Sequence, residues 1–222
     1  MSGRAALLLL ADSRFPTGAH AHSAGVEASH ARGDISDLRD LASFLDGRLL
    51  TTAPVDAAFA ASACANLRPF AELDLELAVR TPSPRLRTIS RSLGRQLIRP
   101  AERAWPSERY SELRAVHPDG PMQAVSLGAV AGAAGLGPAE AALCALHHLV
   151  GAITTAAVRL LGLDPFDVHA LAASLAPRLD QMATAAAELV DRSPSDLPAT
   201  TSLLADVLAE HHATWEVRLF AS

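Results

Sequence analysis

The chain has 222 residues, of which 50% are apolar, 4% aromatic and 19% charged, and its formal charge at neutral pH is −5. This composition excludes a disordered chain and a fibrous repeat, and a chain of this length buries roughly 70% of its unfolded surface on folding. Its two cysteines, Cys64 and Cys144, form no disulfide framework, and the first ten residues lack the charge and apolar length of a signal peptide. We therefore expect a soluble cytoplasmic protein.

Alanine is abundant throughout the chain, and every basic residue is Arg because the sequence contains no Lys. Alanine has the highest helix propensity, and the β-branched and aromatic residues that strands prefer are scarce. The composition therefore predicts an all-α protein, and we expect one globular domain of about nine or ten packed helices over residues 1–222.

Apolar residues that recur at intervals of three and four, together with capping residues and prolines, predict where these helices lie. A polar, proline-bearing stretch at 105–121 is predicted to be a surface loop or the joint between two halves of one core. Residues 191–201 are predicted to be a second loop and residues 215–222 a C-terminal tail. The predicted helices cover approximately residues 5–12, 23–33, 36–52, 54–66, 70–80, 83–100, 122–136, 139–161, 164–190 and 203–212.

Residues 141–158 contain no Asp, Glu or Arg, which raises the question of a membrane span. The segment does contain two His and two Thr residues, and most of its apolar residues are Ala rather than Leu. These features favour a buried helix, and we expect no membrane association.

Several catalytic signatures are absent from the sequence. It has no Gly-rich phosphate loop with a Lys, no GxSxG, no CxxC and no HExxH motif. The lack of Lys excludes Schiff-base chemistry and Walker-type phosphate binding by this chain. We therefore expect a protein that is not an enzyme and uses no cofactor.

The densest cluster of candidate ligands comprises His20, His22, Ser23, Glu27 and His30. His20 and His22 alternate as two ligands on an extended segment would, and Glu27 and His30 share one helical face. The alternative is that these histidines cap helices and bond to backbone, so the cluster indicates only a weak metal candidate at His20 and His22.

Two adjacent histidine pairs, 147–148 and 211–212, point their side chains about 100° apart on a helix. Neither pair is a chelating site by itself, and we expect one histidine of each pair to be in the core or at a cap.

Basic residues concentrate between Arg80 and Arg103, where seven Arg residues meet one acid, Glu102, for a local balance of +6. The rest of the chain carries 12 Arg and 23 acids, a balance of −11. Five of the arginines, spaced four apart from Arg87 to Arg103, form a stripe along one helix. An acidic protein surface is favoured as its partner over nucleic acid, because the chain is acidic overall and has few aromatic residues for stacking.

Four segments carry a resemblance to a known family. Residues 8–18 (LLLADSRFPTG) with 22–27 (HSAGVE) resemble the signature L-x-x-x-D-S-x-(F/L)-P-x-G-x-x-x-H-S-x-G-(L/I/V)-E of the UreF family of urease accessory proteins. Residues 90–97 (SRSLGRQL), 158–164 (VRLLGLD) and 218–222 (RLFAS) are similar to further segments of that family, in the same order.

The resemblance implies an all-α cytoplasmic protein without catalytic activity that helps to build the nickel centre of urease. It implies binding to the accessory protein UreD (also called UreH), recruitment of the GTPase UreG, and a dimeric complex that delivers nickel to apo-urease. His20 stands where the family often has an aromatic residue, so only His22 occupies the family's recurrent histidine position.

The partner-binding residues expected on this basis lie in the four segments. In particular, Arg91 and Arg95 are expected to contact an acidic partner, and residues 218–222 are expected to become ordered only when a partner binds. Two alternatives remain: a nickel-binding metallochaperone that uses the N-terminal histidine loop, and a helical protein that binds nucleic acid through the Arg stripe. The expected partner-binding residues are His22, Glu27, Arg91, Gly94, Arg95, Arg159, Arg218, Leu219 and Phe220.

Overall fold

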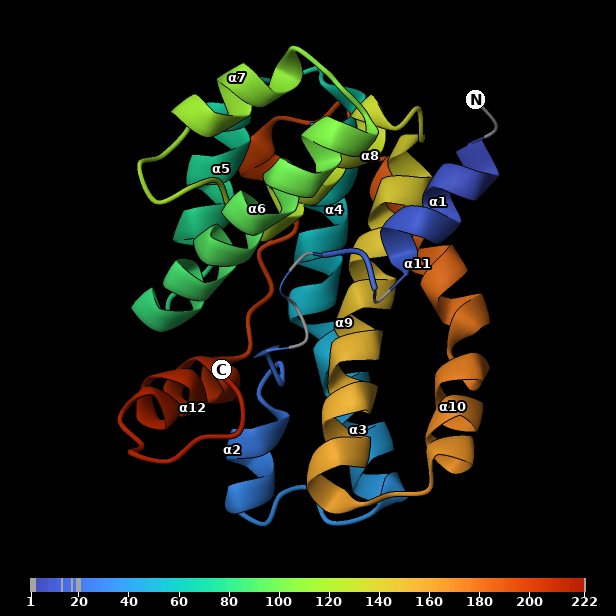
Figure 1. The fold of residues 1–222 in the computed structure, drawn as a ribbon, viewed down its shortest axis with the longest axis vertical. Coiled ribbons are helices and arrows are strands. Elements are labelled where there is room, and N and C mark those ends of the chain that lie inside the picture. Colours follow the sequence, from blue (N-terminus) through green and yellow to red (C-terminus); the bar gives the residue numbers. More distant parts are fainter. Residues whose placement is uncertain (1–2, 13, 17, 19–20, 222) are drawn as a thin grey trace.

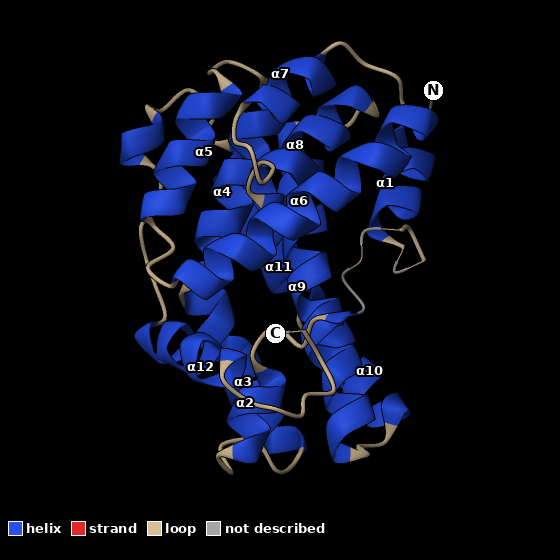
Figure 2. Cartoon of the chain, turned by 60° about the vertical axis from the view of Figure 1, so that its left-hand side comes forward, coloured by secondary structure: helices blue, strands red, loops and turns tan. Residues whose placement is uncertain are grey.

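The computed structural model describes residues 3–12, 14–16, 18 and 21–221, and this part of the chain contains helices and no strand (Figure 2). Helices make up 71% of the structure, which confirms the all-α prediction. The described part holds twelve α-helices: α1 (Gly3–Ala11), α2 (Val26–Ala31), α3 (Leu38–Leu50), α4 (Thr52–Ala65), α5 (Phe70–Val79), α6 (Pro84–Ala104), α7 (Arg109–Ala115), α8 (Gln123–Ala133), α9 (Pro138–Leu161), α10 (Pro165–Ser174), α11 (Ala176–Ala187) and α12 (Leu203–Ala213). A short 3₁₀-helix covers Pro194–Asp196.

Helices α4 and α9 run through the middle of the molecule (Figure 1). Helices α5, α6 and α7 gather at one end, α2 and α3 lie at the other, and α10 and α11 run beside α9. Ten of the fourteen residues of α4 are buried, and most of these are Ala. A Cβ at Gly128 of α8 would come within 2.1 Å of the Ala60 carbonyl oxygen, so small residues allow these helices to pack backbone to backbone.

Two hydrophobic clusters form the core. The first joins α1 and α4–α8 with the start of α9, and it contains Phe59, Tyr110 and Trp105. The second joins α2, α3, α10 and α11 with the rest of α9, and it includes Phe220 from the C-terminal tail. Both clusters share α4 and α9, so the chain packs continuously through these two helices.

Capping residues fix several helix ends where the sequence predicted them. Asp37 accepts a hydrogen bond from the Asp40 N–H (2.9 Å), Ser83 from the Leu86 N–H (3.1 Å) and Asp164 from the Phe166 N–H (2.8 Å). Gly162 ends α9 in the left-handed conformation with φ 66°.

Two predicted boundaries differ from the structure, and the helix that was expected to stop or kink around Pro100 extends beyond it. Helix α6 continues through Pro100 to Ala104, so the proline removes one backbone donor without ending the helix. The predicted helix 164–190 instead breaks at Leu175, two residues before Pro177, and becomes α10 and α11. Helix α2 has Gly25 at its N-cap position with φ 92°, and the Ser23 hydroxyl accepts a long hydrogen bond from the Glu27 N–H at 3.4 Å.

The stretch 105–121 is not entirely a surface loop. It contains α7, a helix of seven residues that buries Tyr110 and Leu113 against α5, α6 and α8. Two apolar residues three apart within a polar stretch are too weak a pattern to indicate such a short helix. Helix α7 and the break at Leu175 raise the count from the predicted nine or ten helices to twelve.

Helix α9 has the length and the mean hydropathy, 1.6 over its most apolar window, that a membrane span needs. Half of that window is buried inside the fold, where α9 packs against α4, α8 and α11. Packing in the core therefore accounts for its apolar composition.

Candidate functional site

The structure brings the N-terminal signature and the C-terminal tail together at Glu27. This buried carboxylate accepts hydrogen bonds from the Leu219 N–H (2.7 Å), the Phe220 N–H (3.1 Å) and the imidazole of His212 (2.8 Å). Burial alone would raise the pKa of Glu27, but these hydrogen bonds outweigh it and hold the pKa below its ordinary value. Glu27 therefore acts as a clamp on the backbone of the tail.

The side chain of Phe220 provides a second anchor for the tail. Its ring is 4% exposed within the second core cluster, and the Arg159 guanidinium lies 4.5 Å from the ring centroid. Arg85 of α6 donates to the Ala221 carbonyl oxygen at 2.9 Å, and the Ala221 N–H donates to the Ala21 carbonyl oxygen at 2.6 Å. Together with the Glu27 hydrogen bonds, these contacts tie residues 219–221 to the segment 21–27, to α6 and to α9.

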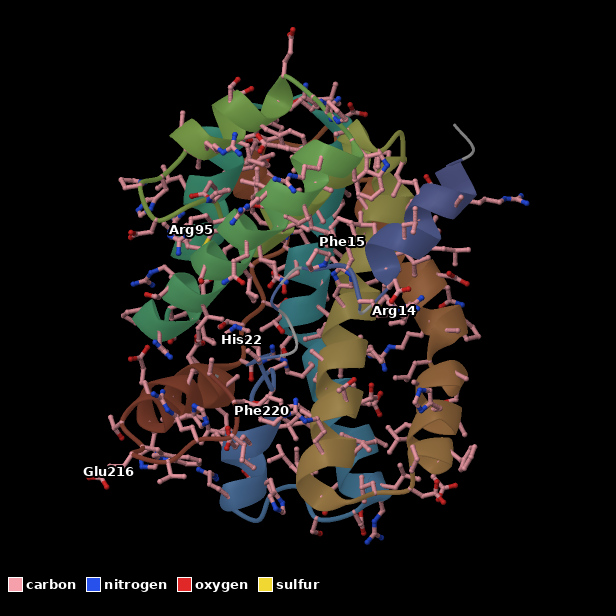
Figure 3. All side chains as sticks on the ribbon, viewed as in Figure 1. Arg14, Phe15, His22, Arg95, Glu216 and Phe220 are labelled. Carbon is pink, nitrogen blue, oxygen red and sulfur yellow. The ribbon has the colours of Figure 1, made fainter. Side chains whose placement is uncertain are left out.

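The tail is thus docked in the isolated chain, which differs from the expectation that it becomes ordered only on partner binding. The sequence-predicted residues Arg218 and Leu219 point away from the body, and Leu219 is 71% exposed. Phe220 is therefore held inward, while Arg218 and Leu219 before it are presented outward. Figure 3 shows Phe220 between α2 and α9, with Glu216 farther out.

The predicted histidine cluster is not assembled as a metal site in the described part of the chain. Both oxygens of Glu27 accept protein hydrogen bonds, and exposed His30 faces the Ile35 carbonyl oxygen at 2.9 Å. His22 is half-buried, and desolvation together with the charge of Arg85 lowers its pKa. Among the described residues no group of three or more His, Cys, Asp or Glu side chains is placed to hold a metal ion, and His20 lies outside them.

One histidine of each adjacent pair is turned into the protein, as predicted: His148 is half-buried at the end of α1, and His212 is buried. His148 bonds to the Leu10 carbonyl oxygen at 2.9 Å, and burial, the largest cause, lowers its pKa to about 4. His212 is 2% exposed against Glu27. Their neighbours His147 and His211 are exposed.

The Arg stripe divides into an inward and an outward part. Arg91 is buried, forms an ion pair with Asp74 at 2.9 Å and donates to the Gly120 carbonyl oxygen at 2.8 Å, so it is not available to a partner surface as predicted. Gly94 is buried as well, because a Cβ there would lie 2.1 Å from the Pro121 carbonyl oxygen. Both residues join α6 to the segment that precedes α8.

Arg95, Arg99 and Arg103, farther along the stripe on α6, are exposed. Arg95, labelled in Figure 3, donates to the backbone carbonyl oxygen of Asp119 at 2.8 Å. No acidic side chain among the described residues forms an ion pair with its guanidinium. We call these three residues the exposed Arg face.

Sequence reasoning missed the residues that complete these contacts, above all Asp74, Arg85 and His212. Each pairs with a residue far away in the chain: Asp74 also accepts from the Met122 N–H at 2.6 Å, and His212 lies opposite Glu27. The adjacency of His211 and His212 predicted one buried histidine, but no local pattern marks Asp74 or Arg85.

Comparisons with known proteins give a consistent result across the chain. The UreF family model matches residues 35–176. A urease accessory protein UreF from Mycobacterium sp. (strain JLS) is 44% identical over 217 residues, which cover 97% of each chain. The proteins of the same name from Mycolicibacterium vanbaalenii and Mycobacterium tuberculosis (strain H37Rv) are 41% and 38% identical over the full length of both chains.

Proposed function

Because the chain belongs to the UreF family of urease accessory proteins, we propose that it is a non-catalytic scaffold for urease maturation. In this role it links a UreD/UreH-type accessory protein to the GTPase UreG, so that nickel is inserted into apo-urease. The proposal includes a homodimeric assembly in the cytoplasm and no resident cofactor, since the chain lacks Lys and UreG would bind the nucleotide.

The observation that carries this proposal is the docked tail. Glu27 and Arg159 belong to two of the family-like segments, and both contact a third one at Leu219 or Phe220. Such a contact network presents Arg218 and Leu219 in a fixed geometry, which lowers the ordering entropy that a partner must overcome. An exposed apolar side chain beside an exposed guanidinium is a combination that protein interfaces favour.

The exposed Arg face is a second surface suited to a partner. Three guanidinium groups on successive turns of α6 attract an acidic protein surface and speed its association. Nucleic acid is less well matched, because the chain carries a charge of −5 overall and few aromatic residues.

Affinity capture of the UreD/UreH-type and UreG partners tests the proposal. We expect the pair Arg218→Ala/Leu219→Ser to reduce capture about tenfold or more, because exposed Arg and apolar anchors dominate such interfaces. The pair Arg95→Glu/Arg99→Glu tests the exposed Arg face in the same way. Arg39→Glu is the matched control, since the Arg39 side chain is 87% exposed on α3 and belongs to neither surface.

Unimpaired capture of both partners by both double variants would refute the scaffold assignment for these surfaces. Urease co-expressed with each variant gives an independent readout, because failed scaffolding leaves apo-urease with reduced nickel content. Light scattering of the wild-type chain, with and without the UreD/UreH-type partner, tests the proposed homodimer.

The nickel-binding alternative is distinguished by titration of the chain with nickel. Tight stoichiometric binding that is lost in His22→Ala would favour a metallochaperone over a scaffold. Partner capture by the same variant is measured in parallel, because His22 follows Ala21, whose carbonyl oxygen accepts from the Ala221 N–H of the tail.

A further inference from the structure

A cavity of about 210 Å³ opens beside the start of α4, between that helix, α6 and α9. One wall is apolar and is formed chiefly by Val55, Leu86, Ile89, Leu93, Leu127 and Leu149. His22, labelled in Figure 3, also lines it. Because an engineered cavity of about 150 Å³ binds benzene, this one has room for a branched small molecule.

The opposite wall carries three polar side chains spaced four residues apart: Arg48, Thr52 and Asp56. Arg48 lies in the last turn of α3, and the other two lie on α4. The Arg48 Nε and the Thr52 hydroxyl are buried and have no hydrogen-bond partner. Arg48 and Asp56 face the same cavity, yet no ion pair or side-chain hydrogen bond involves either of them within the described chain.

Most other polar groups around the cavity already have partners. Asp206 accepts from the Ser83 N–H (3.2 Å) and from the Thr201 hydroxyl (3.1 Å), and Arg80 is paired with Glu76. The Ser90 hydroxyl accepts from the Gln123 N–H at 2.9 Å. Around this cavity the buried polar atoms without a hydrogen-bond partner are the Arg48 Nε and the Thr52 hydroxyl, and the half-buried Asp56 carboxylate lines the same cavity.

The Arg48 and Asp56 side chains are half-buried, and taking a charge out of water without a partner is costly, so a guanidinium and a carboxylate left apart in one cavity indicate a missing bridging group. Burial raises the pKa of Asp56 to about 6 although the charge of Arg48 opposes the shift, so the carboxylate is incompletely compensated. An anion at Arg48 would leave Asp56 uncompensated, and a cation at Asp56 would do the same to Arg48. A molecule with both charges compensates both side chains.

We propose that this cavity is a binding site for a small zwitterion, an α-amino acid with a short apolar side chain. Its carboxylate is held by the Arg48 guanidinium with the Thr52 hydroxyl, and its ammonium group is held by the Asp56 carboxylate. The apolar side chain packs on the wall formed by α6 and α8. This inference does not depend on the scaffold function, because none of these three residues belongs to the tail or to the exposed Arg face.

Calorimetric titration of the full-length wild-type chain with glycine, L-alanine and L-valine tests the proposal. We expect saturable binding of at least one of them, with L-valine the tightest because it covers the apolar wall. Isobutylamine lacks the carboxylate of L-valine and 3-methylbutanoate lacks its ammonium group. Each is expected to bind about tenfold or more weakly, since each leaves one buried charge unpaired.

Variants assign the site on the protein. Arg48→Met and Asp56→Asn keep the side-chain volumes and are expected to abolish binding of the amino acid that binds best. Arg39→Met and Asp180→Asn change exposed residues and are expected to leave that binding unchanged. Circular dichroism melts verify that each variant is folded.

Three results would overturn the proposal: no saturable binding of any of the three amino acids, equal binding of L-valine and either half-ligand, or full binding by a folded Arg48→Met or Asp56→Asn variant. Any of these results would mean that the cavity holds only water, or that it binds a ligand through side chains other than Arg48, Thr52 and Asp56. The half-ligand comparison uses the wild-type chain, so it remains decisive even where a variant fails to fold.

Discussion

The ion pair between Arg91 and Asp74 predicts a large difference between two arginines one turn apart on α6. The side chains of Arg91 and Asp74 are 10% and 4% exposed, and their charged atoms are 2.9 Å apart. In Arg91→Ala, Asp74 keeps its hydrogen bond from Met122 but loses its buried counter-charge. Removing one member of a buried pair costs about 3–5 kcal/mol of unfolding free energy.

Arg95→Ala is the matched control for this prediction. Arg95 is exposed and donates only to a backbone carbonyl, so its removal should cost about 0–1 kcal/mol. In a chain of this size 1 kcal/mol corresponds to about 2–4 °C in Tm, so Arg91→Ala should lower Tm by about 6–20 °C. Differential scanning calorimetry and chemical unfolding measure both variants.

A double-mutant cycle of Arg91→Ala with Asp74→Ala isolates the pair. We expect a coupling free energy of about 1–3 kcal/mol, because each change removes the partner of the other. Equal stability of Arg91→Ala and Arg95→Ala, or a coupling near zero, would show that the pair does not stabilise the junction of α5 and α6.

Three further predictions concern other parts of the structure. The depressed pKa of Glu27 means that its clamp is present above the ordinary value of 4.5 and is lost as the pH falls through the lowered pKa. The protection factors of the tail amides, which are exchange rates corrected for the intrinsic pH dependence, should therefore fall only in acid, and a fall near pH 6 would contradict this. The raised pKa of Asp56, about 6, works in the opposite sense, because the free energy of unfolding falls as the pH rises from 3.8 through 6. Asp56→Asn should therefore stabilise the ligand-free chain by on the order of 3 kcal/mol at pH 8 and by little at pH 4, as measured by urea unfolding. Gly94→Ala should destabilise the chain by about 1–3 kcal/mol, because the added Cβ meets the Pro121 carbonyl oxygen. Gly47 lies in open space within α3, so Gly47→Ala should stabilise the chain by about 0.5–1 kcal/mol. Thermal melts in which both variants shift Tm in the same direction would contradict this packing.

Local patterns in the sequence predict the helices and the family well. The helix at 38–50 follows from its apolar spacing and the capping carboxylate of Asp37, and α9 ends at Gly162 as a C-terminal glycine predicts. The four family-like segments indicate the UreF family by their residues and their order alone. These features depend on residues that are close together in the chain.

The tertiary structure decided which members of these patterns are available for function. Arg91 and Arg95 belong to one stripe, yet Arg91 turns inward because Asp74 of α5 stands opposite it, and Arg95 remains at the surface. Glu27 likewise becomes a clamp only because the tail returns to it from nearly two hundred residues away. The sequence by itself determined the helices and the family, since helix periodicity and capping act between near neighbours. Burial and charge pairing depend on distant segments, and for that reason only the folded chain separates the buried arginine from the exposed one.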